Sequence, residues 1–273
     1  MTDKEFIKEV QDYIYNSYED FKTYHARIIE MFDVFHRICI NNHLKYCVAF
    51  GSLLARVRDK SVMLPWDPDF DVIIPFSEAD ELYNALKKEL PDNMFVKYAV
   101  KDSDLGQYMM RIGIKGFDLD YLHLDVFFAI GLPKVGAEKF VRKMNYYCKV
   151  RISKYRTQYY GSKGIIFLKK MLNFLRYCYI SRRFINRKLD SICHKYVLNN
   201  NTDCAVVAEL NEVFKYDVVF PINLVKDSSG EYCAPNYPEE FLKKAYGNYK
   251  DYMPVESRFI EFYNWVSIMN KSH

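Results

Sequence analysis

The sequence predicts an α/β fold in which a sheet is flanked by helices and followed by a mainly helical C-terminal part. Up to about residue 133, helical patterns of apolar residues alternate with short apolar runs that are typical of strands. From residue 134 to about 200 the pattern is mostly helical. Half of the 273 residues are hydrophobic, and Gly and Pro number only 10 and 9, which excludes a disordered chain.

The first part, residues 1–133, is predicted to be the core with its N-terminal helices. The predicted helices cover 4–42, 53–57 and 77–90, and the predicted strands cover 46–50, 70–75, 95–100, 108–115 and 121–130. Pro75 ends its strand, and Ser77 with Asp80 three residues later predicts a helix cap. The second part, residues 134–273, is predicted to be a basic helical region and a C-terminal element that pack on the core.

Three aspartates lie at the start of the strand predicted over 70–75. Asp69 and Asp71 are two residues apart, so in an extended chain both side chains point to the same side, about 6–7 Å apart. Asp67 continues this alternation. Carboxylates this close repel each other unless a cation lies between them, and ligands made only of oxygen suit Mg²⁺ or Mn²⁺. The spacing therefore predicts metal ligands at Asp67, Asp69 and Asp71.

A phosphate site and a further carboxylate complete the predicted centre. Gly51 and Ser52 follow an apolar strand and open a helix, where backbone N–H groups and a hydroxyl can hold a phosphate. Asp125 lies on the polar face of the otherwise apolar strand 121–130, which makes it the best candidate for the third metal ligand, with Asp120 as the second choice. The alternative is that these aspartates are loop caps and surface charges, since Asp-x-Asp is common.

The same residues belong to one longer motif. It runs Gly51-Ser-Leu-Leu-Ala-Arg-Val-Arg, then Pro65-Trp-Asp-Pro-Asp-Phe-Asp-Val. This resembles the signature of the LicD family, Gly-Thr-Leu-Leu-Gly-x-x-Arg followed by Pro-Trp-Asp-Asp-Asp-x-Asp. The segments 123–127 and 235–249 resemble that family's Asp-containing strand and its closing Tyr-Gly-x-Tyr element. The resemblance covers about residues 20–130 and 218–254, and the region between them has no match.

The motif departs from the family pattern at three positions. Ser52 replaces Thr, Ala55 replaces Gly, and Pro68 replaces one Asp of the acidic run. The first two changes are chemically small. The third implies that the missing carboxylate is not a required ligand, and it leaves the geometry of Asp67 open.

The LicD resemblance implies a nucleotidyltransferase-like mixed sheet and a metal-dependent transferase. Its members move a phosphorylated alcohol, for example phosphocholine, from a CDP-alcohol donor to a hydroxyl of a cell-surface glycan or of its lipid-linked precursor. Carried onto this chain, Asp69, Asp71 and Asp125 become the catalytic and metal-binding residues with Asp67 as a further ligand. Gly51, Ser52 and Arg58 become the residues that bind the donor phosphates, and the cofactor is Mg²⁺ or Mn²⁺.

Two other functions fit the same residues. One is a nucleotidyltransferase that moves NMP from an NTP to a small molecule, and the other is a non-catalytic binding protein that keeps the fold. Trp66 is expected to pack in the core rather than to bind a base. The segment Tyr246-Gly-Asn-Tyr either covers the site or caps a helix.

The net charge of +4 conceals a basic block. Residues 134–195 hold 17 Lys and Arg against two acids, Glu138 and Asp190, so the rest of the chain is acidic. Three interpretations compete: a helix packed on the core with a solvated basic face, an interfacial helix on an anionic membrane, and a nucleic-acid site. The third ranks last because the block holds no nucleic-acid motif and the remaining chain would repel phosphates.

The sequence favours a cytoplasmic location, with a peripheral position at the inner face of the membrane as the alternative. The start of the chain is charged and has no apolar signal segment. Seven cysteines are scattered without a Cys-x-x-Cys pair, which fits reduced thiols. A zinc site made by Cys178, Cys193, His194 and Cys204 matches no standard spacing.

Overall fold

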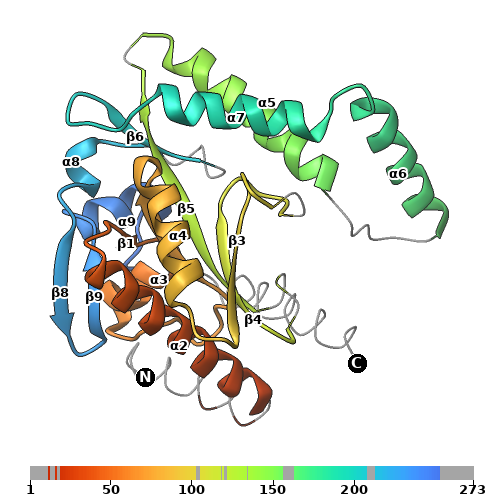
Figure 1. Ribbon diagram of the computed structural model, residues 1–273. Coiled ribbons are helices and arrows are strands. Elements are labelled where there is room, and N and C mark those ends of the chain that lie inside the picture. The colour runs from red at the N-terminus through yellow and green to blue at the C-terminus, as the bar shows by residue number, and fades with distance from the viewer. Residues whose placement is uncertain are drawn as a thin grey trace.

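The fold is mixed α/β, as the sequence predicts (Figure 1). The computed structural model describes residues 12, 16, 19–102, 105–117, 119, 122–133, 135–155, 163–207 and 213–252. Its helices are α2 (Glu19–Asn41), α3 (Phe50–Leu54), α4 (Ala79–Glu89), α5 (Ala137–Tyr155), α6 (Lys163–Tyr177), α7 (Arg182–Lys195), α8 (Tyr216–Val219) and α9 (Pro238–Tyr246), with a π-helical turn η1 (Ala55–Asp59) and a 3₁₀ turn η2 (Phe76–Glu78). Its strands are β1 (Cys47–Val48), β2 (Phe70–Pro75), β3 (Met94–Tyr98), β4 (Met110–Ile114), β5 (His123–Leu132), β6 (Asp203–Val206), β7 (Val213–Phe214), β8 (Asn223–Asp227) and β9 (Gly230–Ala234).

Strand β5 is the centre of the main sheet. The strands lie in the order β1-β2-β5-β4-β3, and β2 and β5 run parallel while β4 is antiparallel to β5. The last four residues of β5 pair with β6, which in turn pairs with β7. All ten residues of β5 are buried, so both of its faces are covered. A second, two-stranded sheet is formed by β8 and β9.

The sheet extends beyond the predicted first part of the chain. Strands β6 and β7 come from the region predicted as mainly helical, yet they continue the sheet through β5. Short strands of four and two residues carry little periodic signal, so the sequence pattern around 203–214 did not reveal them. The described residues after 133 are nevertheless mostly helical, as expected.

Two local predictions differ from the structure. Ser77 does not cap α4: the turn η2 comes first, Glu78 occupies the position before the helix, and no side chain caps it. The strand predicted over 46–50 shrinks to β1, because Phe50 adopts φ of +46° and turns the chain directly into α3. The predicted helix 4–42 is described from Glu19, and most of its earlier residues lie outside the described part.

Helices cover both faces of the sheet. Figure 1 shows α2 and α4 in front of the sheet and α9 behind it. On the α2 side, Phe32 stacks on Phe70 with ring centroids 4.3 Å apart. Trp66 is buried in the core, as predicted. Among the described residues, no helix combines the length and apolar character that crossing a bilayer requires.

Candidate metal and phosphate site

The site is built on the first residues of two neighbouring parallel strands. In the register of β2 and β5, Phe70 lies beside Leu124 and Asp71 beside Asp125. Side chains alternate along a strand and residues in register share a face, so Phe70 and Leu124 point to the α2 side. Asp71 and Asp125 therefore point to the opposite face. Asp69 comes two residues before Asp71 and lies on that same face.

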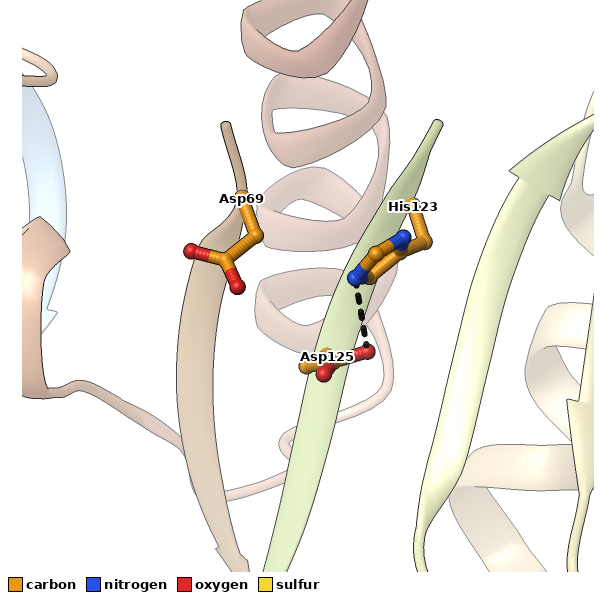
Figure 2. A group of neighbouring side chains, drawn as sticks. All are labelled: Asp69, His123 and Asp125. Atoms are coloured by element: carbon orange, nitrogen blue, oxygen red, sulfur yellow. Dashed lines mark ion pairs between the residues drawn. The ribbon is translucent and has the colours of Figure 1, made fainter. Parts of the chain in front are cut away.

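Three side chains come together there as a possible metal centre. One ligand atom from each of Asp69, His123 and Asp125 lies within 4.8 Å of the others (Figure 2). Figure 2 shows Asp69 next to the start of β2 and the other two residues on β5. The His123 Nε2 atom lies 3.7 Å from Asp125 Oδ1. A metal ion about 2.1 Å from each ligand places those atoms within about 4.2 Å of one another. The observed limit of 4.8 Å is close to that size.

Arg111 binds the central carboxylate. It lies opposite Asp125 on β4, and its Nε and Nη2 atoms donate to the two Asp125 oxygens at 2.7 and 3.2 Å. The guanidinium side chain is 15% exposed and the carboxylate 6%, so this is a mostly buried two-bond ion pair. The pair neutralises one of the two carboxylates of the cluster. A metal ion that takes Asp125 as a ligand has to compete with Arg111 for it.

The acidic and basic groups open into one pocket of about 370 Å³. Its lining includes Asp69, Asp71, Arg111 and Asp125, together with Phe50, Gln107, Phe127, Ala245 and Tyr246. Tyr246 is the last residue of α9, and Gly247 follows as its C-terminal cap with φ of +69°. The sequence left two roles open for this segment, and it has both: Tyr246 lines the pocket, and Gly247 ends the helix.

Helix α2 fixes the turn that presents Asp69. The Tyr24 hydroxyl donates to the Pro68 carbonyl at 2.5 Å, and the His25 imidazole bonds the Asp67 carbonyl at 2.8 Å. Burial lowers the pKa of His25 to about 4, so the ring is neutral at pH 7 and its Nε2–H is the donor. Both bonds hold backbone atoms immediately before Asp69.

Gly51, Ser52 and Asp67 support the turn from the other side. A Cβ atom at Gly51 would clash with the Asp67 carboxylate, so only glycine admits that carboxylate at the start of α3. The buried Ser52 hydroxyl accepts the backbone N–H of Asp71 at 2.9 Å and so ties α3 to β2. Asp67 is buried and is not part of the three-residue cluster. Phosphate binding at Gly51 and Ser52, and metal binding by Asp67, stay predictions.

Arg58 lies away from the pocket. Its guanidinium bonds both oxygens of Asp59 at 2.8 and 3.0 Å and lies over the Tyr252 ring. A third N–H reaches the Tyr249 carbonyl at 3.4 Å. It is absent from the pocket lining, where Arg111 is the arginine. The donor-phosphate role of Arg58 therefore stays a prediction that this arrangement does not favour.

The remaining candidate ligands fall outside the cluster. Asp120 lies outside the described residues. Among the described residues, the possible metal-binding group is formed by Asp69, His123 and Asp125, and it includes none of the four residues considered for zinc. Burial raises the pKa of the Cys193 thiol well above its usual range and that of Cys204 to about 12, which disfavours the thiolates that zinc requires. Cys178 is exposed.

Sequence reasoning did not propose His123, Arg111 or Gln107 as functional. His123 was detectable, because it shares the polar face of the strand with Asp125 at a spacing of two residues. Arg111 was not detectable from the sequence, because its contact with Asp125 depends on the register between β4 and β5.

Comparison with known protein families and curated proteins identifies no relative of this chain. No model of a known protein family matches the chain, and a search of curated proteins finds no match. The LicD resemblance therefore rests on the motif residues alone.

Proposed function

We propose that this protein is a metal-dependent transferase of the LicD type. It moves a phosphorylated alcohol from a CDP-alcohol donor to a hydroxyl group of a glycan or of a lipid-linked glycan. The observation that carries the proposal is the joining of the motif's Asp69 and Asp71 with Asp125 on one face of two parallel strands, in a pocket that also holds an arginine.

The residues of the cluster fit a divalent cation. Asp69, Asp125 and His123 supply two carboxylates and one imidazole. Carboxylates suit Mg²⁺ and Mn²⁺, whereas imidazole is more common on transition metals, so His123 favours Mn²⁺ over Mg²⁺. When bound, such an ion neutralises the donor pyrophosphate and stabilises the charge on the leaving group.

The side chains of the pocket bind the donor phosphate and accept the proton in the transfer step. The acceptor oxygen attacks the phosphorus that carries the alcohol, the P–O bond to CMP breaks, and CMP leaves. Arg111, once released from Asp125, is placed to pair with a donor phosphate through two N–H groups. The hydroxyl proton goes to a carboxylate. We assign this role to Asp71, because Asp125 belongs to the metal cluster whereas Asp71 lines the same pocket outside that cluster.

The test separates donor classes by their products. The protein is incubated with Mn²⁺ and CDP-choline, CDP-ethanolamine, CDP-glycerol or CDP-ribitol, with and without glycan acceptors, and in parallel with CTP. Mass spectrometry then follows CMP and pyrophosphate. We expect CMP from one CDP-alcohol, and we expect Asp69→Asn and Asp71→Asn to reduce its formation at least a hundredfold. Asp203→Asn, at an exposed position on β6, is the matched control and should keep full activity.

The other products decide against the proposal. Pyrophosphate formed from CTP indicates the nucleotidyltransferase alternative. A protein that binds Mn²⁺ but releases neither product from any donor matches the non-catalytic alternative.

A further inference from the structure

Helix α6 exposes nearly all of its apolar side chains. None of its residues is buried, and Phe167 is 70% and Phe174 68% exposed. Figure 1 shows α6 beyond the end of the α5–α7 pair, away from the main sheet. This differs from α7, which buries Ile185, Leu189 and Ile192. The interpretation of the basic block as helices packed on the core therefore holds for α7 and fails for α6.

The exposed apolar residues form one continuous surface, which we call the α6 face. At 3.6 residues per turn they cover about half of the helix circumference. The members of the α6 face are Ile165, Phe167, Leu168, Met171, Leu172, Phe174 and Leu175. The opposite, narrow stripe holds the half-buried Ile166, Asn173 and Tyr177, and Asn173 donates to the Ser153 carbonyl of α5 at 2.7 Å. Thus α6 is held by its narrow stripe and presents its wide apolar face outward.

Basic residues flank the α6 face on both edges. At the same helical spacing, Lys169 and Arg176 lie along one edge, and Lys163 and Lys170 along the other. The helix contains no acid. Arg182 and Arg183 open the adjacent helix α7 and add further positive charge. The surface is an apolar band between two cationic borders.

We propose that the α6 face lies in the interface of an anionic lipid bilayer. The apolar band would enter the boundary between headgroups and acyl chains, and the flanking Lys and Arg would extend to the headgroup phosphates. A 15-residue helix is only about 22 Å long, which suits a helix lying flat on the membrane rather than crossing it. The cationic borders match the anionic headgroups, and the apolar band of a short helix matches the shallow interface.

Other partners fit this surface less well. In a symmetric dimer, the cationic edges of two copies would face each other and repel. A nucleic acid would pair with the basic edges but leave the apolar band without a partner, since base and phosphate contacts need no such band. The proposal does not depend on the catalytic function, because none of these residues lines the metal and phosphate pocket.

Vesicle co-sedimentation of the full chain tests the proposal. Vesicles of phosphatidylcholine alone are compared with vesicles that contain 30% phosphatidylglycerol, at low and high salt. We expect binding to the anionic vesicles that weakens with salt. Each Lys or Arg near such a surface contributes about a fivefold factor, so Lys163→Gln with Arg176→Gln should weaken binding roughly 25-fold.

Matched variants separate the α6 face from the rest of the surface. Leu172→Ser, at 55% exposure, should weaken binding about tenfold. Leu224→Ser, at 57% exposure on β8, should leave binding unchanged. Lys226→Gln with Lys250→Gln is the corresponding charge control. All these positions are exposed, so the variants are expected to fold, and circular dichroism checks this.

Three outcomes would overturn the proposal. The first is absence of binding to anionic vesicles, and the second is equal loss in the α6 variants and their controls. The third is concentration-dependent self-association that Leu172→Ser abolishes, since that result makes the α6 face an interface between copies of the chain.

Discussion

Replacing Arg111 by Gln should destabilise the metal-free protein and at the same time tighten metal binding. Arg111 makes two bonds to Asp125, one of the three residues of the cluster. Without the guanidinium, the Asp125 carboxylate stays mostly buried and loses its positive partner. The same change removes the group with which a metal ion must compete for that carboxylate.

The structure sets the size of both effects. Breaking a fully buried ion pair costs about 3–5 kcal/mol. Since the Arg111 side chain is 15% exposed, we expect a loss of about 2 kcal/mol in the free energy of unfolding. Bonds to a charged group contribute about 1.5–3 kcal/mol, so freeing Asp125 should lower the Kd for Mn²⁺ roughly tenfold to a hundredfold. When the free Mn²⁺ concentration is a hundred times the Kd, metal binding raises the free energy of unfolding by about 2.7 kcal/mol.

The assay is urea unfolding with and without Mn²⁺, together with calorimetric titration of the metal. Arg58→Gln is the matched control, because Arg58 also forms a two-bond pair with a buried aspartate, Asp59, but lies outside the pocket. The Arg58→Gln variant should lose a similar free energy of unfolding, with no change in Mn²⁺ affinity. Weaker Mn²⁺ binding in the Arg111 variant would contradict this competition, because Arg111 would then support metal binding.

Three further predictions concern the ligands and the turn that presents them. His123→Asn should weaken Mn²⁺ binding about tenfold to a hundredfold and Mg²⁺ binding less, measured by calorimetry; equal losses for the two ions contradict a ligand role for the imidazole. Gly51→Ala should cost about 1–3 kcal/mol in urea unfolding because its Cβ meets the Asp67 carboxylate, whereas Gly164→Ala, with open space around it, should not destabilise. The folded-state pKa of His25 is about 4, below its ordinary value of 6.5, so the unfolded chain binds the extra proton between these values. Stability should therefore rise by up to about 3 kcal/mol from pH 4 to 6.5 and level off above, and His25→Gln should flatten this slope; an unchanged slope argues against His25 as its source.

The carboxylates of the site were predictable because strand geometry acts locally. Asp69 and Asp71 share a face by alternation, and Asp125 stands out as the acid of an apolar strand. His123 follows the same alternation. A histidine at the start of a strand can be a metal ligand or a packed side chain, and only its spatial neighbours distinguish these roles. The partner of Asp125 was not predictable, since it follows from the pairing of β4 with β5 rather than from any local motif.

Arg58 illustrates how a motif position and a spatial position can differ. The motif resemblance assigned it to a donor phosphate, but the π-helical turn η1 directs it to the adjacent Asp59. In the basic block, the sequence pattern predicts helices, and α5, α6 and α7 confirm this. Whether a helix is covered depends on what the rest of the chain places against it. The more apolar helix, α6, is therefore exposed, whereas the more polar helix, α7, buries its apolar residues.

Metal titration shows whether Asp69 and Asp125 together bind a divalent cation. Mn²⁺ is titrated into the wild-type protein, Asp69→Asn, Asp125→Asn and the Asp203→Asn control, and binding is measured by calorimetry. We expect one Mn²⁺ site in the wild type and the control, with affinity at least tenfold lower in both cluster variants. Equal Mn²⁺ affinity in all four proteins would contradict this expectation.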